Sequence, residues 1–247
     1  ARVDAEDHPI LERWIEAARE AATTSGPAHP AEGARETDVG LYVDAALAGE
    51  RRAALNVALE MLREDRSIPE VYTALLQSAQ YDVGRRWERN EISVAEEHMA
   101  TAVTQYVLSE LYTRLELPEP SRGDLLVTGV EGELHQLGAH MIADTLEADG
   151  WRVRFLGTQM PHRGILEAVE EHRPRIVGIS VTMLFNLSSA RALVGEIRRR
   201  APDDTRLLVG GSAFRSNPEA WREIGAHGYG RDLHEAIAVA RSLADEE

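Results

Sequence analysis

The sequence contains no cysteine and no lysine. Without cysteine, the chain can form no disulfide, no thiolate metal site and no cysteine nucleophile, and it can tether no cofactor through sulfur. Without lysine, it offers no amine for a Schiff base and lacks the lysine of a phosphate-binding loop. These two absences remove several common kinds of catalytic and cofactor site from the 247-residue chain.

Positive charge is also scarce. All 27 basic residues are arginine, and the formal net charge is −15. A surface that binds nucleic acid needs clustered cationic side chains to displace counterions from phosphates. The densest cluster, Arg198 to Arg200, ends a predicted helix, where such residues offset the helix dipole on a solvated face. We therefore expect no direct nucleic-acid partner.

Long hydrophobic runs are missing as well. No window approaches the roughly 18 consecutive apolar residues that a membrane helix needs. No basic start followed by an apolar core suggests a signal peptide either. The sequence therefore predicts a cytoplasmic protein without a membrane segment.

The first half of the chain has helical spacing of its apolar residues. After a helix over 8–22 and a loop to about residue 40, the pattern predicts helices over 41–48, 51–64, 69–89 and 93–115. Ser93 fits an N-cap, and Glu96 three residues later completes a capping box. We expect residues 41–118 to form a four-helix bundle, preceded by a segment 1–40 of unknown role.

The second half changes character after a linker at 117–123 that contains two prolines and a glycine. Short apolar runs at 125–128, 153–156, 176–181 and 207–209, with a weaker one near Tyr229, alternate with predicted helices. Those helices begin near residues 135, 161, 187, 218 and 232. This alternation predicts that residues 122–247 form a Rossmann-like (flavodoxin-like) α/β domain with a five-stranded parallel sheet. Ligands of such sheets bind beyond the carboxyl ends of the strands.

The loop after the first predicted strand carries an acidic residue close to a histidine. Glu133 comes two residues before His135, and Gly138 follows three residues after it. A carboxylate neighbour fixes the tautomer of an imidazole and raises its basicity, which suits a metal ligand. Taken alone, a histidine at a helix start also fits a capping or solvent-facing role.

Two further motifs stand at predicted strand ends: Ser180 and Thr182 at the third strand, and Gly210-Gly211 after the fourth. In order and spacing, the three motifs resemble the fingerprint of the cobalamin-binding domain family. The resemblance implies that His135 is the lower cobalt ligand, in place of the coenzyme's dimethylbenzimidazole. It also implies that Gly138 and the glycine pair let the backbone approach the nucleotide tail, and that Ser180 contacts the tail or supports the Glu133–His135 pair. Gly210-Gly211 alone would also fit a simple turn.

The predicted bundle contains a second motif, in which nine residues separate Trp87 from Glu97-His98. This spacing resembles the Trp-x9-Glu-His motif of CarH-type adenosylcobalamin-dependent photoreceptors. The resemblance implies that the bundle caps the upper corrin face and that these residues surround the adenosyl group. Trp87 alone would also fit a bundle core residue. Residues 1–40 are too short for that family's DNA-binding domain, and Glu88 stands where some members have a cobalt-binding histidine.

Together, the motifs predict a cobalamin-binding light sensor rather than an enzyme. Photolysis of adenosylcobalamin would drive a conformational or oligomeric change in a homo-oligomer, a dimer or tetramer, for an effector domain or partner protein. A bilin as second chromophore would have to be held noncovalently, because cysteine is absent. The main alternative is a corrinoid methyl carrier of a methyltransferase system; a mutase subunit and a cobalamin storage module are further alternatives.

Overall fold

The computed structural model describes residue 16 and residues 34–215, 217 and 219–245. The chain divides into a helical unit, Ala28–Glu116, and a unit that contains Leu117–Glu247. Apart from Glu16, the helix predicted over 8–22 lies outside the described residues. No helix in the described part of the chain is long and apolar enough to span a membrane.

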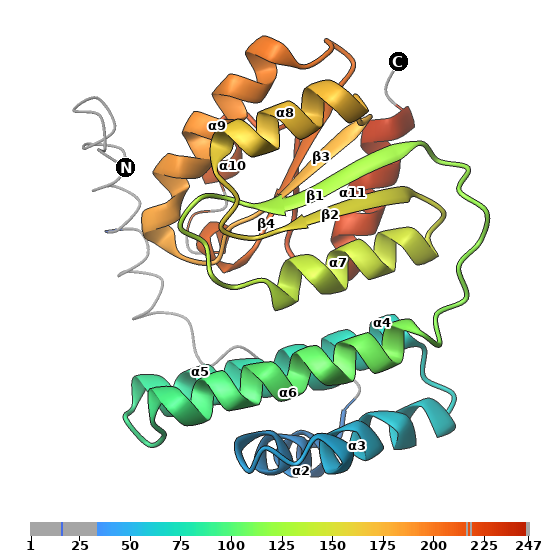
Figure 1. The fold of residues 1–247 in the computed structure, drawn as a ribbon, viewed down its shortest axis with the longest axis vertical. Helices are drawn as coiled ribbons and strands as arrows, with labels where there is room; N and C mark the ends of the chain where they lie inside the picture. The colour runs from blue at the N-terminus through green and yellow to red at the C-terminus, as the bar shows by residue number, and fades with distance from the viewer. Residues whose placement is uncertain (1–15, 17–33, 216, 218, 246–247) are drawn as a thin grey trace. The chain divides into compact units, whose positions relative to one another are not determined.

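The helical unit consists of four helical segments joined by short turns (Figure 1). The first two are α2 (Glu36–Leu47) and α3 (Arg51–Arg63), and the last is α6 (Val94–Tyr112). The third is continuous from α4 (Ile68–Val71) through a π-helical stretch, η1 (Tyr72–Gln77), into α5 (Ser78–Glu88). The spacing over 69–89 therefore predicts the extent of this helix but not its π-helical interruption.

The bundle core consists of aliphatic and tyrosine side chains from every helical segment. Tyr42, Tyr72, Leu75, Leu108 and Leu111 are all fully buried. Burying a side chain of this size stabilises a fold by roughly 1.5–3 kcal/mol. Since each segment contributes residues of this kind, the helices depend on one another for their stability.

Two of these helices begin with a complete capping box. The Ser93 hydroxyl accepts a hydrogen bond from the Glu96 N–H, while the Glu96 carboxylate accepts one from the Ser93 N–H. Ser67 and Glu70 make the same pair of bonds at the start of α4. The predicted capping box at Ser93 is thus present, and it has a counterpart at Ser67.

The α/β unit is built on five parallel strands in the order β2-β1-β3-β4-β5. The strands are β1 (Asp124–Gly129), β2 (Arg152–Gly157), β3 (Ile176–Ser180), β4 (Arg206–Gly210) and β5 (Gly228–Gly230). Nearly all residues of the central strands are buried, because helices cover both faces of the sheet. This is the predicted five-stranded, flavodoxin-like parallel sheet, and with the helical unit it confirms the predicted fold class.

Helices cover the two faces of the sheet in pairs (Figure 1). Helices α7 (Leu137–Ala148) and α11 (Leu233–Asp245) pack on one face, and α8 (His162–His172) and α9 (Leu187–Arg200) pack on the other. The helix expected from about residue 218 is short, α10 (Ala220–Glu223). All the loops that follow strands therefore gather at the carboxyl edge of the sheet.

Candidate functional site

Glu133 lies in the loop that leaves β1 and is fully buried. The chain turns directly before it, because the Glu133 N–H donates to the carbonyl of Val130 at 3.0 Å. A buried carboxylate is unfavourable unless hydrogen-bond donors or a cation surround it. The contacts of this side chain therefore determine whether the loop can hold this shape.

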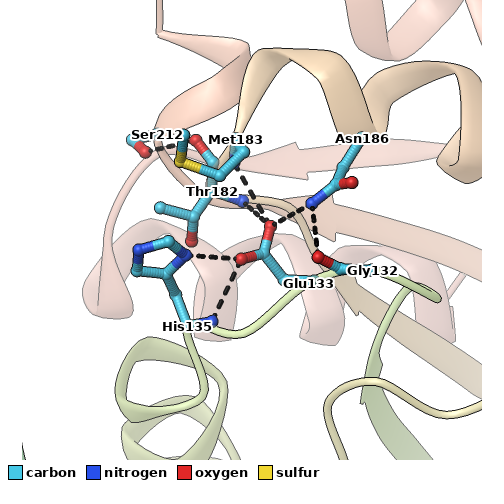
Figure 2. Close-up of polar contacts among 7 residues, drawn as sticks. All are labelled: Gly132, Glu133, His135, Thr182, Met183, Asn186 and Ser212. Carbon is cyan, nitrogen blue, oxygen red and sulfur yellow. Dashed lines mark hydrogen bonds and ion pairs between the residues drawn. The ribbon is translucent and has the colours of Figure 1, made fainter.

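One oxygen of Glu133 contacts His135 twice (Figure 2). Oε1 accepts a hydrogen bond from the His135 N–H at 3.0 Å and lies 2.6 Å from His135 Nδ1. Since an ionised carboxylate only accepts hydrogen bonds, Nδ1 carries the proton of this contact. Nε2 is then the ring nitrogen that can bind a metal.

The other oxygen of Glu133 is held by the loop that follows β3 (Figure 2). Oε2 accepts hydrogen bonds from the N–H groups of Thr182 at 2.8 Å and Met183 at 3.2 Å. The Asn186 amide adds a third donor at 3.1 Å. Five donors thus converge on one carboxylate, and the Glu133 side chain joins two loops of the carboxyl edge.

These contacts also set the charge of the pair. Burial by itself would raise the pKa of the Glu133 carboxyl. Hydrogen bonds from the His135 side chain and N–H, Thr182 and Asn186 outweigh it and lower the pKa to about 2. Glu133 is therefore ionised at neutral pH, and the proton stays on His135 Nδ1.

The His135 side chain is accessible, and the loops after β1 and β3 expose apolar residues. This side chain is 54% exposed, and its Nδ1 is held by the carboxylate of the buried Glu133. Leu134 (67% exposed), Phe185 (60%) and Met183 are exposed large hydrophobic residues on the same two loops. An accessible metal ligand on loops that expose apolar side chains fits a metal carried in a flat macrocyclic ring. The residues present therefore suit a corrinoid.

The loop after β4 completes this edge of the sheet. The Ser212 hydroxyl donates to the carbonyl of Thr182 at 2.9 Å, which ties this loop to the segment that holds Glu133 (Figure 2). Gly211 has a φ of +105°, and a Cβ there would overlap the Val181 carbonyl oxygen. This glycine is therefore required by the packing of the chain on itself.

The other residues of the predicted tail site have different environments. Gly138, in the first turn of α7, has open space where a Cβ would lie. Ser180 and Gly210 are paired at the ends of β3 and β4, and a Cβ on Gly210 would come 3.1 Å from the Gly230 carbonyl. Among the described residues, the Ser180 hydroxyl makes no hydrogen bond, and it is Thr182, Met183 and Asn186 that hold Glu133. Of the three glycines, only Gly138 has open space at its Cβ position, so the packing of the chain does not require glycine there.

The bundle residues are placed on α5 and α6. Trp87 lies in the last turn of α5 and is 48% exposed, so it is not a core residue. Glu97 and His98 lie in the first turn of α6, and His98 Nδ1 is 2.5 Å from Glu97 Oε2. The His98 side chain is 75% exposed. The bundle thus carries a second carboxylate–imidazole pair on its surface.

Two residues that the sequence analysis did not select support these pairs. Asn186 contacts Glu133 across a separation of 53 residues. Thr101 places its hydroxyl 3.1 Å from Glu97 Oε1. Asn186 belongs to no sequence motif. It reaches Glu133 because β1 and β3 are paired in the sheet. The spacing of four between Glu97 and Thr101 was the one available signal for the second contact.

Comparison with family models covers both units. Residues 123–238 match a model described as B12 binding domain, and residues 41–112 match a second model with the same description. The two matches together span the α/β unit and the helical unit.

Comparison with curated proteins finds corrinoid proteins. The chain is 28% identical over 183 residues to the dimethylamine corrinoid protein of Methanosarcina barkeri, which covers 70% of this chain and 82% of that protein. It is 27% identical over 166 residues to dimethylamine corrinoid protein 3 of Methanosarcina mazei, which covers 66% of this chain and 98% of that protein. The HTH-type transcriptional repressor CarH of Myxococcus xanthus is 28% identical over 70% of this chain, but over only 56% of its own length.

Comparison with solved structures supports the fold. The monomethylamine corrinoid protein of Methanosarcina barkeri superimposes with a TM-score of 0.74 at 20% identity. The match covers 85% of this chain and all of that protein. At this level of identity the similarity concerns the fold alone.

The prediction of a light sensor is therefore wrong. Methylamine corrinoid proteins match this chain over most of their own length, whereas CarH is matched over little more than half of its length. That prediction rested on the spacing of Trp87 and Glu97-His98. The curated relatives favour the alternative, a corrinoid methyl carrier.

Proposed function

Given that the chain carries B12-binding domains, we propose that it is a corrinoid carrier protein of a methyltransferase system. The observation that carries the proposal is the Glu133–His135 pair, held by five donors at the carboxyl edge of the sheet. The similarity of the chain to dimethylamine corrinoid proteins supports methyl transfer as the class of reaction. On this proposal the chain is not itself an enzyme, and a partner methyltransferase makes and breaks the bond to the methyl group.

Each unit has a part in holding the corrinoid. His135 Nε2 would be the nitrogen that ligates the cobalt of a bound corrinoid, and the ionised Glu133 keeps the proton on Nδ1 and orients the ring. Leu134 and Phe185 provide apolar surface and exclude water around that ligand. Gly138 leaves open space for the nucleotide tail, and Ser180 and the Gly210-Gly211 turn would line it from the ends of β3 and β4. The bound corrinoid supplies a cobalt centre that accepts and gives up a methyl group.

Three residues of the helical unit would contact the upper ligand of a bound corrinoid. Trp87 offers an exposed indole for packing at the end of α5, and Glu97 and His98 offer polar groups near the start of α6. For a methyl carrier, methylcobalamin is expected to bind at least as tightly as adenosylcobalamin.

Replacement of the lower ligand tests the binding site. The His135→Ala variant is expected to bind hydroxocobalamin at least tenfold more weakly and to lose the histidine-ligated spectrum. Electron paramagnetic resonance of the reduced Co(II) form, with ¹⁵N-histidine in the protein, identifies the axial nitrogen directly. A His162→Ala variant serves as control. Unchanged nitrogen coupling in His135→Ala would contradict the proposal.

Turnover tests the carrier role separately from binding. The reduced, corrinoid-loaded protein is incubated with ¹³C-labelled dimethylamine, methanol or another simple methyl donor and a matching methyltransferase. Label is expected to appear on the protein-held corrinoid. A loaded protein that accepts label from no methyl donor with any partner enzyme would reject the carrier role and leave corrinoid binding intact.

A further inference from the structure

Gln159 has a backbone conformation that L-amino acids rarely adopt. Its φ is +57°, in the left-handed region that favours glycine. Three other described residues that are not glycine also have a positive φ, namely Asp65, Asn90 and Arg173. Each of these three lies at the carboxyl end of a helix, where a left-handed residue lets the chain satisfy the last helical carbonyls. Gln159 instead lies between β2 and α8, so no helix end accounts for its conformation.

The residues on either side of Gln159 are packed against the rest of the α/β unit. Thr158 presses on the end of β1, because a Cβ on Gly129 would come within 2.7 Å of the Thr158 methyl group. Met160 packs against the core between the sheet and helices α8 and α9, and its sulfur would lie 3.0 Å from a Cβ on Gly164. The fold therefore holds Gln159 in the left-handed conformation from both sides.

An irregularity in the neighbouring strand pair shapes the start of this loop. β1 and β2 pair in register as far as Val127 and Phe155. The next pair joins Thr128 to Gly157, so Leu156 is an extra residue, as in a β-bulge. The Gly157 carbonyl accepts a hydrogen bond from the Thr128 hydroxyl at 3.3 Å, and this glycine also has a positive φ. Bulges of this kind re-aim side chains and are frequent next to active sites.

The Gln159 side chain is exposed at the carboxyl edge of the sheet, the edge that carries His135. β2 is the neighbour of β1 in the sheet, so the loops that follow these two strands emerge next to each other (Figure 1). The Gln159 amide makes no hydrogen bond to any residue that the structure describes. A residue held in a strained conformation, with an exposed amide that bonds to no described residue, is suited to contact a ligand.

We propose that Gln159 is a further corrinoid-binding residue, whose amide forms hydrogen bonds with the carboxamide groups at the edge of the corrin ring. A carboxamide both donates and accepts hydrogen bonds, and the glutamine side chain offers the same two functions. The left-handed conformation destabilises the empty protein, and the hydrogen bonds to the corrinoid offset that cost in the loaded protein. The inference rests on corrinoid binding by the α/β unit, as in the proposed function, and it needs no contact with the helical unit.

Two substitutions in the whole chain separate the amide from the backbone. Gln159→Gly removes the amide and relieves the strain, so the Tm of the empty protein is expected to rise by about 2–4 °C. Gln159→Leu removes the amide and keeps the strain, so its Tm should stay close to that of the wild type. Both variants are expected to bind hydroxocobalamin roughly three- to tenfold more weakly. Titration followed by absorbance gives the dissociation constants, and circular dichroism gives the Tm.

Arg173→Gly is the matched control, because Arg173 has the same left-handed conformation but ends α8, just before the amino end of β3. It should raise the Tm by a similar amount without changing the affinity. Wild-type affinity in both Gln159 variants would overturn the inference. Weaker binding confined to Gln159→Gly would overturn it too, since the effect would then belong to the backbone, and so would a lowered Tm in that variant. If the wild type bound no corrinoid, the proposed function would fail first, and the inference with it.

Discussion

At the residue scale, the Glu133 carboxylate holds three parts of the carboxyl edge in one arrangement. It accepts hydrogen bonds from His135 in the loop after β1 and from Thr182 in the loop after β3. The Thr182 carbonyl in turn accepts a hydrogen bond from Ser212 in the loop after β4. A carboxylate buried this completely is stable only while its donors are present. The orientation of His135 therefore depends on residues of the loops after β3 and β4.

Asn186 offers the sharpest test of that dependence. Asn186→Leu has a similar volume but removes one donor from the buried Glu133. It is expected to lower the free energy of unfolding by about 1–3 kcal/mol and to weaken cobalamin binding about tenfold. Chemical denaturation and titration with hydroxocobalamin measure the two effects. Ser188→Ala, two residues further along, serves as control, and an Asn186→Leu protein with wild-type affinity would show that Glu133 does not need this donor.

At the element scale, the start of α6 carries both a helix cap and the Glu97-His98 pair. Ser93→Ala removes the cap and is expected to cost about 1 kcal/mol of stability. Because the first turn then frays, cobalamin affinity should fall as well. Ser67→Ala removes the identical capping box of α4 and is the matched control. It should lose similar stability with no loss of affinity, and equal affinities for the two variants would contradict a role for the α6 terminus.

The capping box of α6 also predicts that the stability of the protein depends on pH. Hydrogen bonds from the Ser93 N–H and hydroxyl lower the pKa of Glu96 below its ordinary value of 4.5. A carboxyl with a lowered folded-state pKa stabilises the fold above its ordinary pKa, and this contribution is lost as the pH falls through the folded-state value. The stability difference between wild type and Ser93→Ala should therefore shrink in acid. Denaturation at pH 7 and at pH 3 measures it.

At the scale of the whole molecule, the chain consists of two separately packed units joined by an exposed segment. Residues 113–123 have no helix or strand, and the boundary between the two units falls within this segment, after Glu116. Arg122 and Arg241 both pair with Asp149, which ties the end of this segment to α11. The part of the segment 113–123 that is open to a protease therefore lies before Arg122.

Limited proteolysis tests this arrangement. The chain has no lysine, so trypsin cleaves only after arginine, and Arg114 lies in the exposed segment. Early cleavage is expected after Arg114, to yield a helical fragment and an α/β fragment that each retain their far-ultraviolet circular dichroism. Mass spectrometry identifies the cut. A first cleavage among the arginines of the described helices would contradict the division into two units.

The sequence alone was sufficient for the positions of most helices and strands, the cap at Ser93 and the pairing of Glu133 with His135. These features depend on residues a few positions apart, so spacing and propensity contain the needed information. The function assigned from the same spacing, a light sensor, was wrong, because the chain matches methylamine corrinoid proteins over most of their length.

Tertiary structure alone decided which residues hold the site. The donors from Thr182, Met183 and Asn186 reach Glu133 only because β1 and β3 pair in the sheet. Likewise, Gly211 proved necessary for packing, while Gly138 faces open space. Contacts between segments some 50 residues apart leave no periodic pattern in a sequence, because they depend on the order of strands rather than on local spacing.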